Sequence, residues 1–243
     1  MKNIAIVICL HGDELFGLEI MDKLSKNIPV FIGNPLAIEK RRRFIDMDLN
    51  RSFPGDEKGS YEEKRAAYLL NELKNFDCVI DIHSSSCDLE LFGIITKVNE
   101  KNLALANKLG LKKLIIMSEK VGLGKSLIDH VPCGISLEIG PHEKKENIDE
   151  VIKAINNSNG VEEHEIEFLE VFSVIPKIER NIKILINNFK PVKKGSLIAK
   201  GKKDYYAEED FIPLFVGEKA YENVLCLATR RINREELNKH LFS

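Results

Sequence analysis

Uninterrupted apolar runs alternating with amphipathic stretches dominate the first part of the chain. Residues 4–10 are all apolar, a pattern typical of a strand buried on both faces. Residues 15–26 carry apolar positions at the spacing of an amphipathic helix. Further apolar runs predict strands, and further amphipathic stretches predict helices. The strands are expected at 29–33, 76–83, 91–96, 114–117 and 133–141, and the helices at 60–75, 99–109 and 147–156.

This alternation of strand and helix predicts an α/β fold, with a mostly parallel mixed sheet flanked by helices. The pattern changes after 156–160, an Asn-Asn-Ser-Asn-Gly stretch that resembles a linker. Beyond it, short strand-like pieces are separated by lysine- and glycine-containing turns. We therefore expect two domains, an α/β domain at 1–160 and a small all-β domain at 161–243 that ends in a charged tail, a candidate helix.

A long polar segment between the second strand and the next helix has no clean period. It contains a basic run at 40–43 and then Asp-Leu-Asn-Arg-Ser-Phe-Pro-Gly at 48–55. Long ordered loops usually carry function, so this segment is a candidate part of a binding site. We interpret Asp48 as a structural loop residue rather than a ligand.

Net charge and hydropathy indicate which classes of binding partner the protein is not expected to have. The net charge of −2 provides no bulk field that would favour nucleic acid or an anionic membrane. The sequence has neither an apolar run of membrane-spanning length nor a signal-peptide pattern. We expect a cytoplasmic protein with no nucleic-acid or membrane partner.

The cysteines are odd in number, scattered and without a Cys-x-x-Cys pair. Several of them sit in or beside apolar runs. We interpret them as buried small hydrophobic residues rather than disulfides or zinc ligands. They are Cys9, Cys78, Cys87, Cys133 and Cys226.

Three predicted strands end on side chains suited to a metal. His11 and Glu14 follow the first strand, and His83 and Glu138 lie at the ends of two others. Taken alone, the His-Gly-Asp-Glu stretch fits either half of a metal site or a helix start whose acidic residues complement the dipole. Two histidines and one glutamate are an established set for catalytic zinc.

The two remaining carboxylates at these strand ends suggest supporting roles. Glu138 has apolar neighbours, so its pKa would respond to burial, and its position suits a residue that moves a proton. Asp81, two residues before His83, could orient that histidine or simply face a helix.

The order of these motifs resembles the succinylglutamate desuccinylase/aspartoacylase family. The matching residues are the His-Gly-Asp-Glu stretch at 11–14, Asn-Pro at 34–35, Arg43, residues 48–55, Asp-Ile-His-Ser at 81–84, Glu-Ile-Gly-Pro at 138–141 and the segment 213–221. The resemblance extends from end to end of the chain and implies a zinc-carboxypeptidase-like fold.

The resemblance also implies a role for each matching residue. His11, Glu14 and His83 match the zinc ligands, and Glu138 matches the general base and acid. Arg43 matches the arginine that polarises the scissile carbonyl.

Substrate-binding roles are implied in the same way. Asn50 and Arg51 match the pair that holds the α-carboxylate, which suits the bidentate fork of a guanidinium. Tyr221 matches a substrate-binding tyrosine. Lys125 is the nearest counterpart, at a different spacing, of an arginine that binds the side-chain carboxylate in members that cleave acetylaspartate. Lysine is a point charge without the fork.

Together these features predict a zinc-dependent hydrolase with one Zn²⁺ per chain. It would remove the acyl group from an N-acyl amino acid or a similar small amide, so its partner is a small molecule. Homo-oligomerisation stays open. Two alternatives remain: a metallocarboxypeptidase, since the same geometry serves both reactions, and a non-catalytic zinc-binding sensor. Glu138 argues against the sensor, because a purely structural site needs no proton shuttle.

Overall fold

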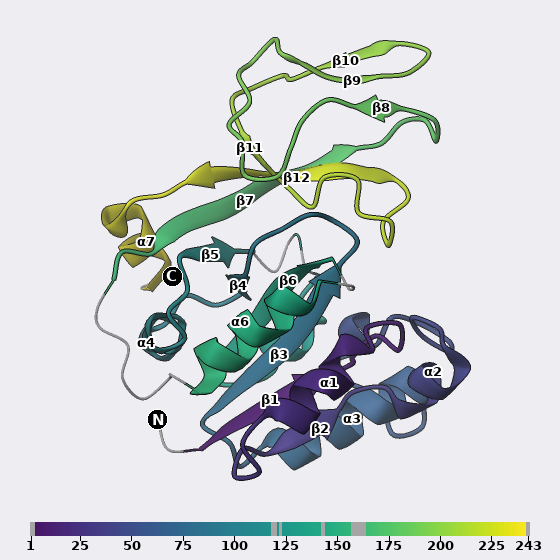
Figure 1. The fold of residues 1–243 in the computed structure, drawn as a ribbon, viewed down its shortest axis with the longest axis vertical. Helices are drawn as coiled ribbons and strands as arrows, with labels where there is room; N and C mark the ends of the chain where they lie inside the picture. The colour runs from purple at the N-terminus through teal and green to yellow at the C-terminus, as the bar shows by residue number, and fades with distance from the viewer. Residues whose placement is uncertain (1–2, 118–120, 122, 142–143, 157–163, 242–243) are drawn as a thin grey trace.

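A nine-stranded mixed sheet forms the centre of the molecule (Figure 1). The computed structural model describes residues 3–117, 121, 123–141, 144–156 and 164–241. The strand order in the large sheet is β11-β12-β7-β5-β4-β6-β3-β1-β2. Its strands are β1 (Ile4–Ile8), β2 (Val30–Ile32), β3 (Cys78–Ser85), β4 (Phe92–Ile95), β5 (Lys113–Ile116), β6 (Gly134–Pro141), β7 (Glu167–Pro176), β11 (Ile212–Leu214) and β12 (Val224–Arg231).

The direction of pairing changes along the sheet. Strands β2, β1, β3 and β6 are parallel neighbours, and β4, β5 and β7 form a second parallel set. Strand β4 joins β6 in the antiparallel sense, and β12 and β11 extend the far edge in the same sense. The predicted fold class, a mostly parallel mixed sheet flanked by helices, is confirmed.

Helices cover the sheet on both faces because successive strand residues point to opposite sides. One face of the central strands, with Ile80 and Ile82, packs against a layer of helices. That layer consists of α1 (Phe16–Lys23), α4 (Glu100–Lys108), α6 (Lys145–Asn156) and α7 (Arg234–Leu241). The other face, with Val79, packs against α3 (Tyr61–Leu73) and the short 3₁₀ helices η1 (Leu49–Arg51) and η2 (Leu127–Asp129).

Helix α2 (Pro35–Lys40) was not predicted, because its six residues are too few to show a helical period. Its start is nevertheless encoded locally. The side chain of Asn34 accepts a hydrogen bond from the Ala37 backbone N–H, and Pro35 occupies the first helical turn. The predicted start of α3 is confirmed, since Ser60 and Glu63 form a reciprocal capping box.

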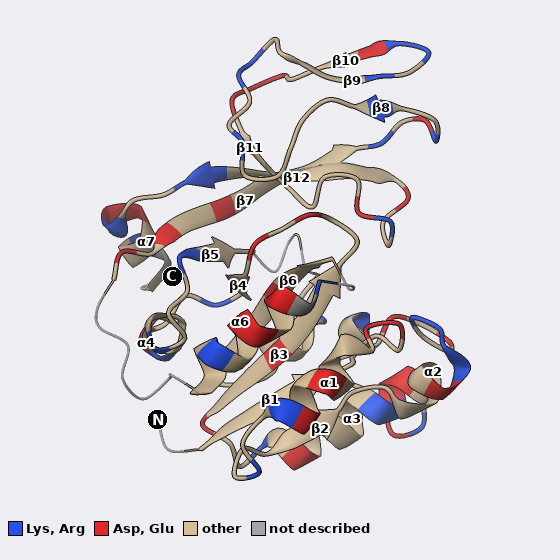
Figure 2. Ribbon diagram, viewed as in Figure 1, with Lys and Arg blue, Asp and Glu red and all other residues tan. Residues whose placement is uncertain are grey.

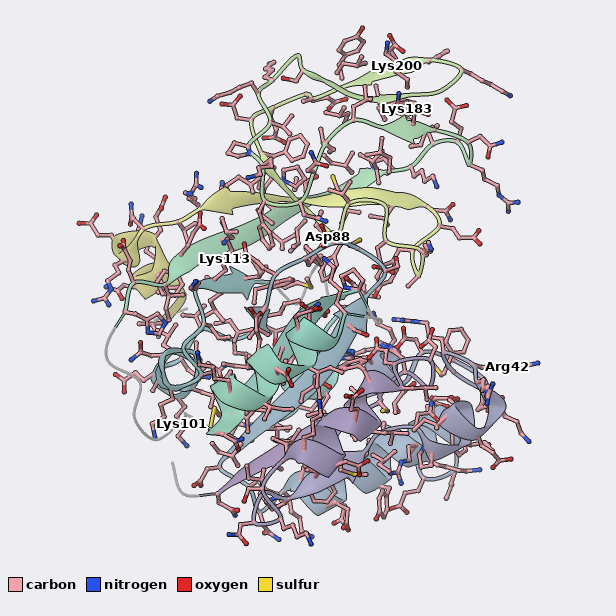
Figure 3. The ribbon with its side chains drawn as sticks, viewed as in Figure 1. Arg42, Asp88, Lys101, Lys113, Lys183 and Lys200 are labelled. Carbon is pink, nitrogen blue, oxygen red and sulfur yellow. A yellow bond between two sulfur atoms is a disulfide. The ribbon has the colours of Figure 1, made fainter. Side chains whose placement is uncertain are left out.

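The C-terminal part of the chain contributes to two sheets. Strands β7, β11 and β12 extend the large sheet, whereas β8 (Lys183–Ile184), β9 (Leu197–Lys200) and β10 (Asp204–Tyr206) form a small antiparallel sheet. Lys183 and Lys200 mark this small sheet in Figure 3. The predicted boundary at residue 160 lies outside the described residues, so the two-domain division stays a prediction.

Charges of both signs are interspersed along the chain (Figure 2). Within the described residues, none of the helices has the length and apolar character needed to cross a membrane.

The interpretation of all five cysteines as unpaired was wrong for two of them. Cys78 and Cys133 form a disulfide, whereas Cys9, Cys87 and Cys226 are free and buried. The next residues in each strand, Val79 and Gly134, are register partners in the β3–β6 pair. The disulfide therefore joins the starts of these two strands, and the strand register that brings the cysteines together is not visible in the sequence.

Candidate metal centre and its pocket

A tight turn after β1 carries the first two candidate ligands, His11 and Glu14. Cys9 has a φ of 53°, in the left-handed region that non-glycine residues rarely adopt. Gly12 permits close packing there, because a Cβ at this position would overlap the backbone of Ala37 in α2. The Gly12 backbone N–H donates to the carbonyl of Arg43 at 3.0 Å. The turn is therefore fixed against both α2 and the loop that follows it.

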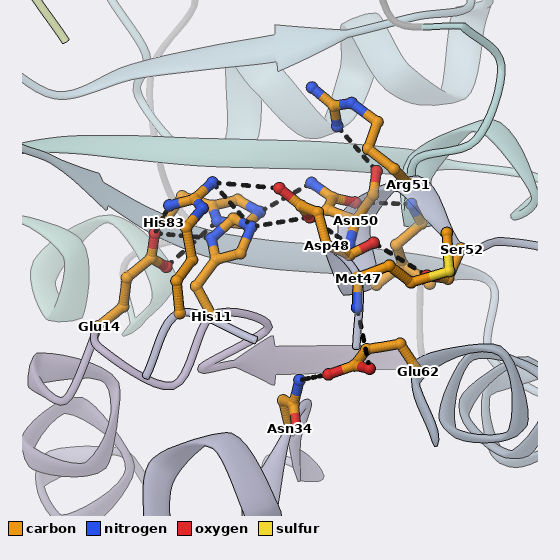
Figure 4. A network of polar contacts seen from close by, with 12 residues as sticks. His11, Glu14, Asn34, Met47, Asp48, Asn50, Arg51, Ser52, Glu62 and His83 are labelled. Atoms are coloured by element: carbon orange, nitrogen blue, oxygen red, sulfur yellow. Dashed lines mark hydrogen bonds and ion pairs between the residues drawn. The ribbon is translucent and has the colours of Figure 1, made fainter. Parts of the chain in front are cut away.

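His11, Glu14 and His83 form a buried group that could hold a metal ion (Figure 4). One candidate ligand atom from each residue lies within 4.8 Å of the other two. His11 Nδ1 is 2.8 Å from Glu14 Oε1, and His83 Nδ1 is 3.2 Å from Glu14 Oε2. Strands β1 and β3 are parallel neighbours, so their carboxyl ends bring these residues to the same edge of the sheet.

Each of the two imidazoles has a further carboxylate at its other nitrogen. Asp81 Oδ2 is 2.9 Å from His83 Nε2, and Asp48 Oδ1 is 3.1 Å from His11 Nε2. Such partners fix the ring orientation and leave the opposite nitrogen to bind a metal. Asp81 therefore occupies the orienting position considered for it. Asp48 also accepts from the Asn50 backbone N–H, so it stabilises the loop as expected and supports His11 as well.

The electrostatics of this group favour a cation at its centre. Burial opposes ionisation of Glu14, but the two neighbouring histidines outweigh it and hold the pKa of this carboxyl well below its usual range. Burial likewise opposes protonation of His83, yet Asp81 and Glu14 raise the pKa of the imidazole well above its ordinary value. A metal ion could replace the protons that these carboxylates attract.

Glu138 lies beside the candidate ligands on the neighbouring strand. It is the register partner of His83 in the β3–β6 pair, and only 9% of its surface is exposed. Burial raises the pKa of Glu138 to about 8, with smaller contributions from the surrounding charges. A carboxyl group with a pKa near neutral is suited to both accepting and donating a proton.

The loop that carries Arg43 and Asp48 is anchored by Glu62, a fully buried residue of α3. Its carboxylate accepts hydrogen bonds from the backbone N–H groups of Ile45, Asp46 and Met47, at 2.7, 3.0 and 3.3 Å. It also accepts from the Asn34 side chain at 3.0 Å (Figure 4). Sequence reasoning missed this anchor, since three of these four partners are backbone groups that leave no residue-type signal.

The other predicted site residues from this loop lie around the same centre. Arg43 Nη2 is 3.0 Å from His11 Nε2 and 3.4 Å from Asp48 Oδ2. Asn50 accepts from the Leu127 backbone N–H at 2.9 Å, and its Nδ2 lies 3.2 Å from His83 Nε2. Arg43 thus contacts His11, and Asn50 contacts His83.

Arg51 and Tyr221 meet although they are far apart in sequence. The Arg51 guanidinium donates to the Tyr221 hydroxyl at 3.2 Å and to the Asn50 carbonyl at 2.7 Å. Lys125, in contrast, is exposed and does not line the pocket around the centre, so the structure does not bring it to the other predicted residues.

Glu218 holds the Tyr221 loop over the strand that supplies His83. Its carboxylate accepts hydrogen bonds from the backbone N–H and the hydroxyl of Ser86, each at 2.9 Å. It also accepts from the Ala220 backbone N–H at 3.1 Å. Sequence reasoning missed this role, because Ser86 and Glu218 are 132 residues apart and no motif marks the pair.

A pocket of about 320 Å³ opens over the candidate metal centre. His11, Glu14, His83 and Glu138 line it together with Arg43, Asn50, Arg51 and Tyr221. The pocket thus collects every predicted site residue except Lys125. It lies on the face of the sheet that α3, η1 and η2 flank, opposite the main helical layer.

Comparison with known proteins gives concordant matches. The succinylglutamate desuccinylase/aspartoacylase catalytic domain model matches residues 1–157. A probable aspartoacylase from Prochlorococcus marinus subsp. pastoris is 29% identical, over 91% of this chain and 90% of that protein.

Solved structures share the fold. Murine aminoacylase 3 aligns with a TM-score of 0.78 at 20% identity, covering 95% of each chain. Succinylglutamate desuccinylase/aspartoacylase from Rhodobacter sphaeroides aligns with a TM-score of 0.74 at 16% identity, covering 95% of this chain and 86% of that one.

Proposed function

The chain belongs to the succinylglutamate desuccinylase/aspartoacylase family, and from this premise we propose that it is a zinc-dependent deacylase of N-acyl amino acids. The reaction would hydrolyse the amide bond between an acyl group and the amino nitrogen. The observation that carries this proposal is the buried group of His11, Glu14 and His83, with Glu138 in register beside it.

The residues present fit a zinc ion. Two imidazole nitrogens and one carboxylate oxygen converge, and outer carboxylates orient both rings. Zinc held by such a set acts as a Lewis acid that makes water a nucleophile near neutral pH. An open pocket on one side leaves access for a substrate, as a catalytic site requires and a closed structural site does not.

Glu138 would move the proton. As a carboxylate it takes a proton from the attacking water, and as an acid it returns a proton to the departing amino nitrogen. Its pKa of about 8 places both protonation states within reach at neutral pH. Glu14 and Asp48 differ from it, because the histidines beside them outweigh burial and hold the pKa of each carboxyl well below its usual range.

Arginine and amide side chains would position the substrate. Arg43 reaches the centre beside His11, where its positive charge can stabilise the oxygen on which negative charge develops. Asn50, Arg51 and Tyr221 lie together at the pocket wall, and the guanidinium fork can hold an α-carboxylate in two places.

A hydrolysis screen tests the proposal. The purified protein is loaded with zinc, its metal content is measured by mass spectrometry, and release of free amino acid is followed over a panel of N-acyl amino acids and dipeptides. We expect about one zinc per chain and hydrolysis of N-acyl amino acids that a chelator abolishes and zinc restores. Turnover of dipeptides alone would favour the carboxypeptidase alternative. Zinc binding without any turnover would favour the sensor.

A further inference from the structure

We infer that the pocket selects substrates whose variable group is neutral and apolar rather than acidic. This inference rests on the proposed deacylase function and concerns the part of the substrate beyond the scissile amide and the α-carboxylate. The group selected is an uncharged hydrocarbon, which could belong either to the amino acid side chain or to the acyl chain.

One wall of the pocket is apolar. It is supplied by strands β4, β7 and β12, by Met117 and Val121 after β5, and by Phe215 after β11. Its main residues are Ile94, Met117, Val121, Val174, Phe215 and Leu227. Most of them belong to one hydrophobic cluster that also packs Phe92, Ile115 and Val171 beneath the pocket. The wall is thus the exposed edge of a continuous hydrophobic core.

This wall begins next to the reacting centre. Ile94 on β4 is the register partner of Ser136 on β6, two residues before Glu138 on the same face of that strand. Leu227 on β12 is paired with Val174 on β7, farther along the same sheet. A group attached to the scissile amide beside Glu138 would therefore extend over a hydrophobic surface.

The arginines that line the pocket already have partners within the protein. Among the described lining residues, the arginines are Arg43 and Arg51. Arg43 contacts Asp48 and lies 4.0 Å from Glu14, while Arg51 is bonded to Asn50 and Tyr221. Both are assigned above to the scissile carbonyl and the α-carboxylate. Neither remains for a second substrate carboxylate.

Among the described residues beside Phe215, the charged side chain that lines the pocket is a carboxylate. Glu218 lines the pocket beside Phe215, and its carboxylate is held by Ser86. Thr96 and Ser136 contribute hydroxyl groups rather than cations. A carboxylate placed against this wall would lose its hydration, meet no described cation and approach Glu218. An apolar group would instead gain from leaving water.

Two matched substrate pairs test the inference and separate its two sources. N-acetylleucine and N-acetylaspartate differ in the side chain, and N-hexanoylglycine and N-succinylglycine differ in the acyl group. We expect kcat/KM to be at least about 10-fold higher for the apolar member of at least one pair, a typical size for discrimination by a hydrophobic pocket. Equal or faster turnover of the acidic member in both pairs would overturn the inference.

Direct binding keeps this test separate from the proposed function. Isothermal titration of the zinc-loaded protein with leucine, aspartate, hexanoate and succinate measures affinity without turnover. Tighter binding of leucine than aspartate, or of hexanoate than succinate, supports the apolar pocket even if no amide is hydrolysed, in which case the deacylase proposal alone fails. Tighter binding of aspartate than leucine together with tighter binding of succinate than hexanoate overturns the apolar pocket.

Substitution of Leu227 tests the wall itself. Leu227→Arg should reduce kcat/KM for the apolar substrates at least about 10-fold and shift the preference toward the acidic ones. Leu185→Arg is the matched control, because Leu185 is 40% exposed, lies beside the small sheet and does not line the pocket. This control should keep the wild-type preference. A Leu227→Arg variant with an unchanged preference would contradict the inference.

A milder variant covers the case in which an arginine at position 227 prevents folding. Leu227→Ala removes hydrocarbon from the wall without adding charge, and its folding is checked by circular dichroism. We expect KM to rise about 10-fold for the preferred apolar substrate and to stay nearly constant for its acidic counterpart. An unchanged KM for the apolar substrate would remove Leu227 from the binding surface and with it the proposed wall.

Discussion

The two sides of the pocket are built in different ways. The metal side comes from the ends of β1, β3 and β6, which are parallel neighbours, and from one anchored loop. The apolar side is assembled from β4, β7, β12 and two connecting segments that are far apart in sequence. The residues proposed to carry out the reaction thus lie in short motifs, whereas those proposed to select the substrate are distributed over the fold. Changes on the metal side should affect every substrate alike, and changes on the apolar side should affect substrates unequally.

Removal of both histidine ligands should have the largest effect. The double variant His11→Ala, His83→Ala loses two of three candidate donors and should bind no stoichiometric zinc, with hydrolysis of every substrate falling to background. Zinc per chain is measured by mass spectrometry, and circular dichroism checks the fold. Full zinc content in this variant would refute the assigned site.

Glu138→Gln should have the second largest effect on hydrolysis. This substitution keeps the shape of the side chain and removes the proton acceptor. We expect zinc content to be unchanged and kcat to fall by about 10²-fold or more for apolar and acidic substrates alike. Glu150→Gln, at an exposed position of α6, is the matched control. A loss restricted to one substrate class would place Glu138 in substrate selection rather than in proton transfer.

Asp81→Asn should have a smaller effect, because Asp81 acts through His83. An amide at this position can still contact the ring but cannot supply the negative charge. We expect zinc affinity to fall by about 10- to 100-fold, measured by competition with a chelating dye. At saturating zinc, the ratio of rates between apolar and acidic substrates should stay at the wild-type value. Asp88→Asn, on the exposed loop after β3, should leave zinc affinity unchanged. A changed substrate ratio in Asp81→Asn would break the separation between the two sides.

The sequence alone was sufficient to predict candidate site residues that lie at or just after the end of an apolar strand. His11 and Glu14 belong to a single turn, and His83 and Glu138 each end an apolar run, so parallel pairing brings them to one edge. The strands themselves were recognisable from their apolar runs. The family model matches residues 1–157, the part of the chain that contains these four residues.

Contacts that depend on strand register or on backbone partners could not be predicted. The Cys78–Cys133 disulfide requires knowing that Val79 faces Gly134 across two strands. The roles of Glu62 and Glu218 depend on N–H groups, which every residue except proline carries. The apolar wall left no motif either, because a leucine in a pocket and a leucine in a core look alike in sequence.

Lys125 illustrates the limit of transferring a role by sequence position. Its carbonyl accepts a hydrogen bond from the Phe53 backbone N–H, while its side chain is exposed outside the pocket lining. The neighbouring residues Ser126 and Ile128 do line the pocket. A binding role for Lys125 therefore stays a prediction.

The hydrogen bonds of Glu62 determine whether the entropic cost of ordering the loop is part of folding or part of substrate binding. Fixing one residue of a flexible segment costs about 1–2 kcal/mol in backbone entropy. Because Glu62 holds three consecutive N–H groups through hydrogen bonds within the protein itself, that cost belongs to folding and is not subtracted from affinity. Arg43, Asn50 and Arg51 would then already be in position when a substrate binds. For this loop, binding would resemble docking to a rigid surface, and loop closure would not limit its rate.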